Sequence, residues 1–206
     1  MPNTTATSPI SEAEARQQAE ALLHAGLAAS QDNDSEKALE LFAQASAAYP
    51  ASGLPHFLAG SEYAALGQVD KAEGALANAV LLAPDFHIAR YQLGLLQFSS
   101  GRAASALVTW QPLFSLEDTQ ALGHFVRGFA ALAQDDFAGA KAHFDAGLVR
   151  NTDNAALSAD IQKVLQRMGD ALAQGPSEAP PAPTESNQAA AHILLSNYGK
   201  FGGTVH

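Results

Sequence analysis

Seven histidines are the side chains in this sequence best suited to bind a metal ion or to transfer protons. The sequence contains no HExxH motif, and no histidine pair stands with carboxylates at ligand spacing on one predicted helix face. We therefore interpret the histidines as structural polar side chains and predict no metal site. They are His24, His56, His87, His124, His143, His192 and His206.

Other residues that could do chemistry also have simpler interpretations. The carboxylates of Asp135 and Asp136 precede a predicted helix, whose N-terminus favours negative charge. The glycines at 199, 202 and 203 do not follow a strand and so do not form a phosphate-binding loop. Trp110 is predicted to lie in the core. Because the chain has no cysteine, disulfides, thiolate metal sites and cysteine nucleophiles are excluded. We expect neither enzymatic activity nor a cofactor.

The composition limits the class of protein. Of the 206 residues 47% are hydrophobic, alanine is abundant and β-branched residues are few, which favours helices. The formal net charge of −10 opposes binding to nucleic acid, which requires clustered Lys and Arg. No apolar run reaches the roughly 18 residues of a membrane span, and the first residues lack the basic and apolar regions of a secretory signal. We expect a cytoplasmic protein with no membrane insertion and no nucleic-acid partner.

A period of 34 residues organises most of the chain. It is carried by alanines in similar contexts at Ala38, Ala72, Ala106 and Ala140. A glycine precedes each alanine by twelve residues, at Gly26, Gly60, Gly94 and Gly128. A large apolar residue follows each alanine by four, at Phe42, Leu76, Trp110 and Phe144. This pattern resembles the tetratricopeptide repeat (TPR), a 34-residue helix–turn–helix unit.

The resemblance implies an all-α, right-handed TPR solenoid of four helix–turn–helix repeats plus a C-terminal capping helix. The repeats fall at about 19–52, 53–86, 87–120 and 121–154, and the capping helix at 155–173 would seal the last open face. A capping box at Ser11 and Glu14 opens the first helix, so the predicted domain is 11–173 after a disordered N-terminus of residues 1–10. Gly67 and Gly101 are predicted to lie in turns between helices.

In TPR solenoids the first helix of each unit, here called the A helix, lines a concave groove that binds peptides. The second is called the B helix. Eleven apolar residues of this chain fall at groove positions: Leu54, Phe57, Leu58, Ile88, Tyr91, Leu95, Phe98, Leu122, Phe125, Val126 and Phe129. Large exposed apolar patches usually mark binding surfaces. The alternative is that these residues fill contacts between neighbouring helices.

The groove chemistry narrows the predicted partner. TPR domains that hold a peptide's C-terminal carboxylate use Lys, Asn and Arg, but the corresponding residues here are Leu23, Leu27, Leu58, Ile88 and Gln92. The apolar lining is similar to that of TPR chaperones that hold hydrophobic segments. We predict a non-catalytic interaction module, an adaptor or chaperone, that binds an apolar peptide segment. The alternative is a structural subunit that self-assembles through the groove or the tail.

Beyond the repeats the composition changes. Residues 174–187 are rich in Pro, Ser and Glu and predict an extended linker. An apolar tail at 188–206 follows, with a motif of Ile193, Leu194, Leu195, Tyr198 and Phe201. Three interpretations of the tail remain open. It docks into its own groove or that of a second copy, which would make a homo-oligomer; it is a motif for another protein; or it packs on the capping helix.

Overall fold

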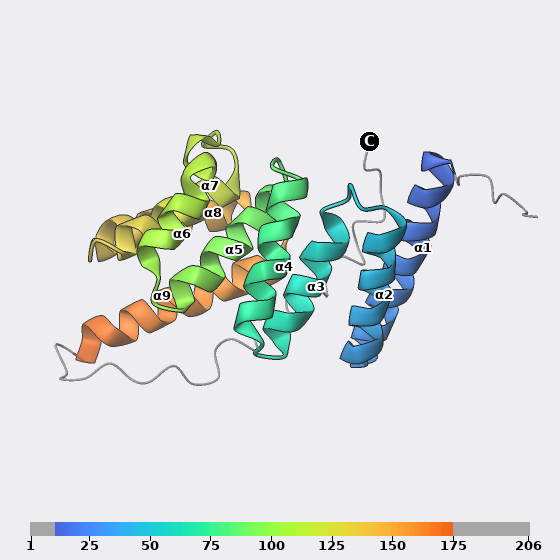
Figure 1. Cartoon of the computed structure of the whole chain (residues 1–206). Coiled ribbons are helices and arrows are strands. Elements are labelled where there is room, and N and C mark those ends of the chain that lie inside the picture. Colours follow the sequence, from blue (N-terminus) through green and yellow to red (C-terminus); the bar gives the residue numbers. More distant parts are fainter. Residues whose placement is uncertain (1–10, 175–206) are drawn as a thin grey trace, which may run out of the picture.

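The computed structural model describes residues 11–174, and this span consists of nine α-helices and one short 3-10 helix, without strands (Figure 1). The helices are α1 (Glu12–Gln31), α2 (Ser35–Ala48), α3 (Leu54–Ala65), α4 (Val69–Leu82), α5 (His87–Ser99), α6 (Ala103–Trp110), η1 (Gln111–Ser115), α7 (Ala121–Leu132), α8 (Phe137–Arg150) and α9 (Ala155–Gln174). From α1 to α8 the helices form consecutive antiparallel pairs stacked side by side. The predicted all-α solenoid is confirmed.

Side chains that accept hydrogen bonds from the backbone fix where several helices begin. The capping box at the start of α1 is present, because the Glu14 N–H donates to Ser11 Oγ (3.3 Å) and the Ser11 N–H donates to Glu14 Oε2 (2.9 Å). At the start of α8, Asp136 Oδ1 accepts from the Gly139 N–H at 2.8 Å. Such caps satisfy N–H groups that have no partner within the helix.

The turns between the paired helices share one backbone conformation. Gly67 and Gly101 have φ angles of 68° and 77°, as the sequence predicted. Asn33 and Asp135 occupy the same position in the first and fourth units, with φ angles of 61° and 59°. Asn and Asp are the non-glycine residues that tolerate this left-handed region best. Asp135 therefore serves the turn, and of the two neighbouring aspartates only Asp136 caps the helix.

The spacing between the glycine and the large apolar residue is the same in all four units, and it has a direct physical cause. A Cβ atom on Gly60 would lie 2.8 Å from Leu76, and one on Gly128 would lie 2.5 Å from a ring atom of Phe144. Gly26 faces Phe42 and Gly94 faces Trp110 in the same way. Each glycine of an A helix thus makes room for the large side chain of its own B helix, which is buried.

The third unit departs from the regular repeat. Its B helix, α6, ends at Trp110 and continues as the 3-10 helix η1, which contains Pro112. Proline has no N–H to donate to the carbonyl four residues earlier, and its ring clashes with that carbonyl. Leu113, three residues after Trp110, is nevertheless fully buried.

The buried residues form two clusters that divide the solenoid. The N-terminal core joins α1 to α5 and is built largely from alanine and leucine, with Phe42 and Phe57. The C-terminal core joins α5 to α9 and contains Tyr91, Trp110 and three phenylalanines. The half-buried Ile88 packs against both.

Aromatic rings connect the helices of the C-terminal core. Ring centroids are 5.4 Å apart for Trp110 and Phe129, 5.0 Å for Phe129 and Phe144, and 5.2 Å for Phe98 and Phe129. The indole Nε1 of Trp110 donates to the Tyr91 carbonyl oxygen at 2.9 Å, so its one polar atom is satisfied inside the core.

The last helix, α9, contacts more than the end of the fourth unit. Its buried residues Leu157 and Ile161 belong to the same core as Tyr91 of α5. Burial raises the pKa of the Tyr91 hydroxyl, and the negative charge of Asp160 raises it further, which places Asp160 near α5. In Figure 1, α9 runs back below α6 and α5 and does not extend the stack beyond α8. The predicted capping helix therefore packs against α8 and joins the core that also contains Tyr91 of α5.

Candidate functional site

Six of the eleven predicted groove residues do not line an open surface. Each is at most 3% exposed; they are Phe57, Leu58, Tyr91, Phe125, Val126 and Phe129. Their rings meet neighbouring elements: the centroids of Phe57 and Phe86 are 4.8 Å apart, and those of Tyr91 and Phe125 are 6.4 Å apart. The prediction that these six side chains face a bound peptide is wrong, because residues of neighbouring helices enclose them, among them Trp110 and Phe144 of B helices, whose rings meet Phe129.

The other five groove residues remain partly exposed: Leu54, Ile88, Leu95, Phe98 and Leu122. Leu54, Ile88 and Leu122 stand 34 residues apart, each in the first turn of its A helix. We call these three residues the apolar ladder. Each packs with one side against a core and leaves the other accessible. The structure thus reduces the predicted lining to a row of half-buried aliphatic side chains.

A buried polar contact joins the first two A helices and was not predicted. Glu62, which is only 3% exposed, accepts a hydrogen bond of 2.7 Å from the Ser30 hydroxyl. A buried charged group requires such a partner. The only signal in the sequence is an acidic residue at a repeat position that holds alanine or leucine in the other units, namely Ala28, Leu96 and Ala130.

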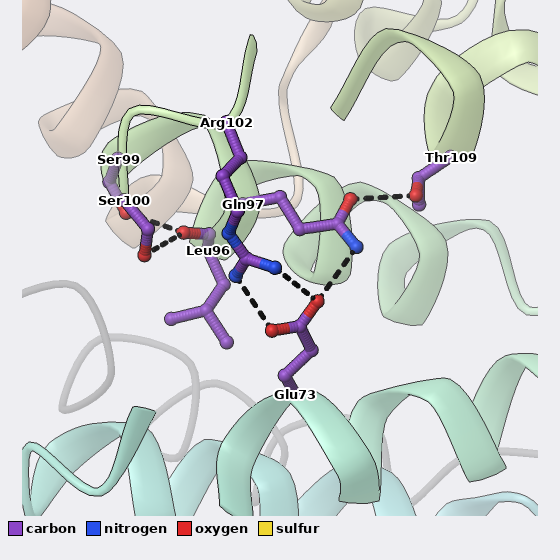
Figure 2. Close-up of polar contacts among 7 residues, drawn as sticks. All are labelled: Glu73, Leu96, Gln97, Ser99, Ser100, Arg102 and Thr109. Atoms are coloured by element: carbon purple, nitrogen blue, oxygen red, sulfur yellow. Dashed lines mark hydrogen bonds and ion pairs between the residues drawn. The ribbon is translucent and has the colours of Figure 1, made fainter. Parts of the chain in front are cut away.

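A second polar cluster ties the second unit to the third (Figure 2). Arg102 donates two hydrogen bonds to Glu73, at 2.9 and 2.6 Å, and Gln97 Nε2 donates a third at 3.1 Å. Thr109 Oγ1 in turn donates to Gln97 Oε1 at 2.7 Å. The hydrogen bonds from Arg102 lower the pKa of the Glu73 carboxyl. Because both carboxylate oxygens are engaged by protein donors, we interpret this cluster as a structural link between α4 and the α5–α6 pair.

Two histidines come together between α7 and α8. The ring centroids of His124 and His143 are 5.8 Å apart, and His124 Nε2 lies 3.0 Å from the Asp118 carbonyl oxygen. Burial lowers the pKa of His143, and the charges of His124 and Arg127 lower it further. In residues 11–174 no group of three or more His, Cys, Asp or Glu side chains could hold a metal ion.

The structure also bears on membrane insertion and on which predicted regions it describes. None of the helices in residues 11–174 combines the length and apolar character needed to cross a membrane. The predicted tail motif lies outside the described residues, as do residues 1–10 and nearly all of the predicted linker.

Comparison with known proteins identifies the architecture. No family model and no curated protein matches the sequence. Among solved structures, the crystal structure of MamA matches with a TM-score of 0.54 and 19% identity, over 70% of this chain and 88% of that one. MamA from Desulfovibrio magneticus RS-1 matches with a TM-score of 0.57 and 13% identity, over 91% and 98% of the two chains.

An IFIT1 monomeric mutant with Gppp-AAAA matches with a TM-score of 0.56 and 17% identity, over 90% of this chain and 47% of that one. This chain therefore spans about half the length of IFIT1. MamA and IFIT1 are TPR-type solenoid proteins. At these identities the likeness concerns the fold, and it agrees with the 34-residue period and the glycine contacts described above: the chain folds as a TPR-type solenoid.

Proposed function

We propose that this chain is a non-catalytic, cytoplasmic protein-interaction module, an adaptor or chaperone, that binds an apolar peptide segment along its A helices. The observation that carries the proposal is the apolar ladder of Leu54, Ile88 and Leu122, which repeats one partly exposed aliphatic side chain in three successive units. Leu95 and Phe98 are half-buried residues of α5 that widen this surface.

The spacing of the ladder sets the form of the peptide. Neighbouring packed helices lie about 8–10 Å apart, and an extended peptide advances about 3.3 Å per residue. An apolar residue at about every third position would therefore meet successive ladder side chains. Full burial of an aliphatic side chain contributes about 1.5–3 kcal/mol, so three such contacts can give a specific but reversible complex.

Charge supports a protein partner over nucleic acid. The matched IFIT1 structure is that of a mutant with Gppp-AAAA, but this chain has 21 acidic and 11 basic residues. A surface of that balance repels a phosphate backbone. The proposal therefore includes no nucleic-acid partner, no membrane insertion and no cofactor.

The test uses an extended synthetic peptide with leucine at every third position, and a scrambled peptide of the same composition. The triple variant Leu54→Gln, Ile88→Gln, Leu122→Gln should bind the patterned peptide at least about tenfold more weakly than the natural chain, because each substitution removes an apolar contact. The matched control is the triple variant Leu81→Gln, Val108→Gln, Val149→Gln. It changes three aliphatic residues of B helices, each of which is 76–79% exposed.

Fluorescence anisotropy of the labelled peptide gives the affinities, and circular dichroism verifies that each variant is folded. The control triple should retain the affinity of the natural chain. The proposal fails if the patterned peptide does not bind the natural chain, or if both triples lose the same affinity.

Self-assembly through the tail is the second function to test, since the tail is rich in apolar residues. Light scattering after size-exclusion chromatography, over a range of concentrations, compares the full chain with one lacking residues 188–206. A monomer at all concentrations supports the adaptor. An oligomer that dissociates when the tail is removed supports the structural subunit.

A further inference from the structure

The packed face of α9 is an amphipathic stripe that is longer than its contact with the core. Leu157, Ile161 and Met168 are buried, at 4%, 1% and 9% exposure. The next residue of the stripe, Leu172, is 59% exposed. Residues 169–173 are all exposed, and a Cβ atom on Gly169 would meet nothing within 4 Å. The helix therefore continues beyond the surface on which it packs, as its projecting end in Figure 1 shows.

One residue weakens the contact that α9 does make. The side chain of Asp160 is only 19% exposed and stands beside the buried Ile161. Its ion-pair partner is Lys163 of the same helix, at 3.2 Å, and its charge acts on the buried Tyr91 of α5. A carboxylate withdrawn from water opposes burial unless it is fully paired. An apolar residue at this position would hold α9 more tightly.

We propose that the apolar surface of the C-terminal core beneath α9 is a binding site for an amphipathic helix of a partner protein, and that α9 is a resident occupant which the partner displaces. This inference rests on the proposed interaction function. It adds that the partner segment bound at the C-terminal core is an amphipathic helix. Binding of an amphipathic helix to an apolar surface is a common recognition mode.

The occupant already present defines the partner's chemistry. In α9 the residues Leu157, Ile161, Val164 and Met168 follow the spacing i, i+4, i+7, i+11, which is one face of a helix. A competing helix needs the same apolar spacing and an uncharged residue in place of Asp160. It must also compete with a tethered helix, whose effective concentration is of the order of millimolar.

The probe is a fluorescent synthetic peptide with the sequence of residues 155–174 and the substitution Asp160→Leu. It is titrated into three full-length proteins: the natural chain, Ile161→Asp, and Leu172→Asp as the matched control on the same stripe. In Ile161→Asp a buried apolar side chain becomes a charge, so the resident helix is released. This variant should bind the probe at least about tenfold more tightly than the natural chain, as removal of a tethered competitor requires. Leu172→Asp should behave like the natural chain.

Two results would overturn the proposal. In the first, Ile161→Asp loses more helix by circular dichroism than the 20 residues of α9 contain, which would make α9 an integral part of the C-terminal core. In the second, the variant stays folded and the probe does not bind. The patterned extended peptide is measured on the same samples. If the extended peptide binds and the helical probe does not, the proposed function stands and only the displaceable helix is rejected.

Discussion

The N-terminal and C-terminal cores are built on one repeat but are filled differently. Seven of the fifteen buried residues of the N-terminal core are alanines, whereas the C-terminal core has two alanines among twelve and five aromatic residues. Small side chains let helices approach until their backbones nearly touch. In the C-terminal core five aromatic rings fill the interior instead, and buried side chains of α9 join them. One period can therefore specify two kinds of packing.

The comparison also shows where the solenoid can be divided. In repeat proteins stability is approximately the sum of the units and of their contacts with nearest neighbours. The link of Glu73, Arg102 and Gln97 lies where the two cores meet, between α4 and the α5–α6 pair. Damage to one core should thus be felt mainly in that core, and the following predictions test this.

The largest effect is expected for Trp110→Ala. Trp110 is fully buried, stacks on Phe129 and donates a hydrogen bond to the Tyr91 carbonyl. Removal of a buried aromatic side chain usually costs about 3–5 kcal/mol. Chemical denaturation followed by circular dichroism should show a weakened transition for α5 to α9, with the N-terminal helices unfolding later.

The control for this substitution is Val108→Ala, on the same helix but 76% exposed, which should change stability by less than about 0.5 kcal/mol. A single transition shifted as a whole in Trp110→Ala would show that the two cores are one cooperative unit.

An intermediate effect, with opposite signs at two sites, is expected for glycine substitutions in the second unit. Gly60→Ala places a methyl group 2.8 Å from Leu76, which should destabilise the N-terminal core by about 1–3 kcal/mol. Gly74→Ala, inside α4 with nothing within 4 Å, should stabilise the chain by about 0.5–1 kcal/mol because alanine favours helix. Thermal melts of the two variants measure both. Equal shifts would mean that the glycine contact is not required.

The smallest effect concerns pH. The pKa values of His56 and His143 lie below the ordinary 6.5 because both rings are partly buried. In the unfolded chain these groups bind protons more readily, so the stability they contribute is present above pH 6.5 and is lost as the pH falls below it. At His143 the charges of His124 and Arg127 also lower the pKa, whereas those of Asp118 and Asp136 raise it.

Melting curves at pH 7.5 and pH 5.5 measure this dependence. Acidification should lower the Tm by about 1–3 °C, and His143→Gln and His56→Gln should each reduce the fall. A fall in Tm that neither substitution reduces would contradict the assignment of the pH dependence to these two rings.

Much of the fold could be predicted from single residues. Each unit contains one contact between a glycine and the large side chain sixteen residues later, and the glycines are those at 26, 60, 94 and 128. The capping box at Ser11 and the turn glycines were also predicted and found. These features depend on residues close in sequence, and their geometry follows from helix periodicity alone. The early end of α6 before Pro112 could have been predicted from the effect of proline on helices, but it was not predicted.

The candidate site was less predictable. Phe125 and Phe129 have the helical spacing of a surface stripe, yet they are 0% and 3% exposed. A stripe identifies which face of a helix is apolar, but its exposure depends on the distance to the next A helix and on what else covers it. Leu54, Ile88 and Leu122, which lie in the first turn of their helices, stay partly accessible.

By itself, the sequence determined the number of units, the pairing of helices within each unit and the residues that close each pair. These are local relations, repeated four times, and each is fixed by contacts between residues sixteen apart. Only the tertiary structure decided how units stack on one another and where the unrepeated α9 packs. Both depend on the sum of many distant contacts, which no period in the sequence encodes.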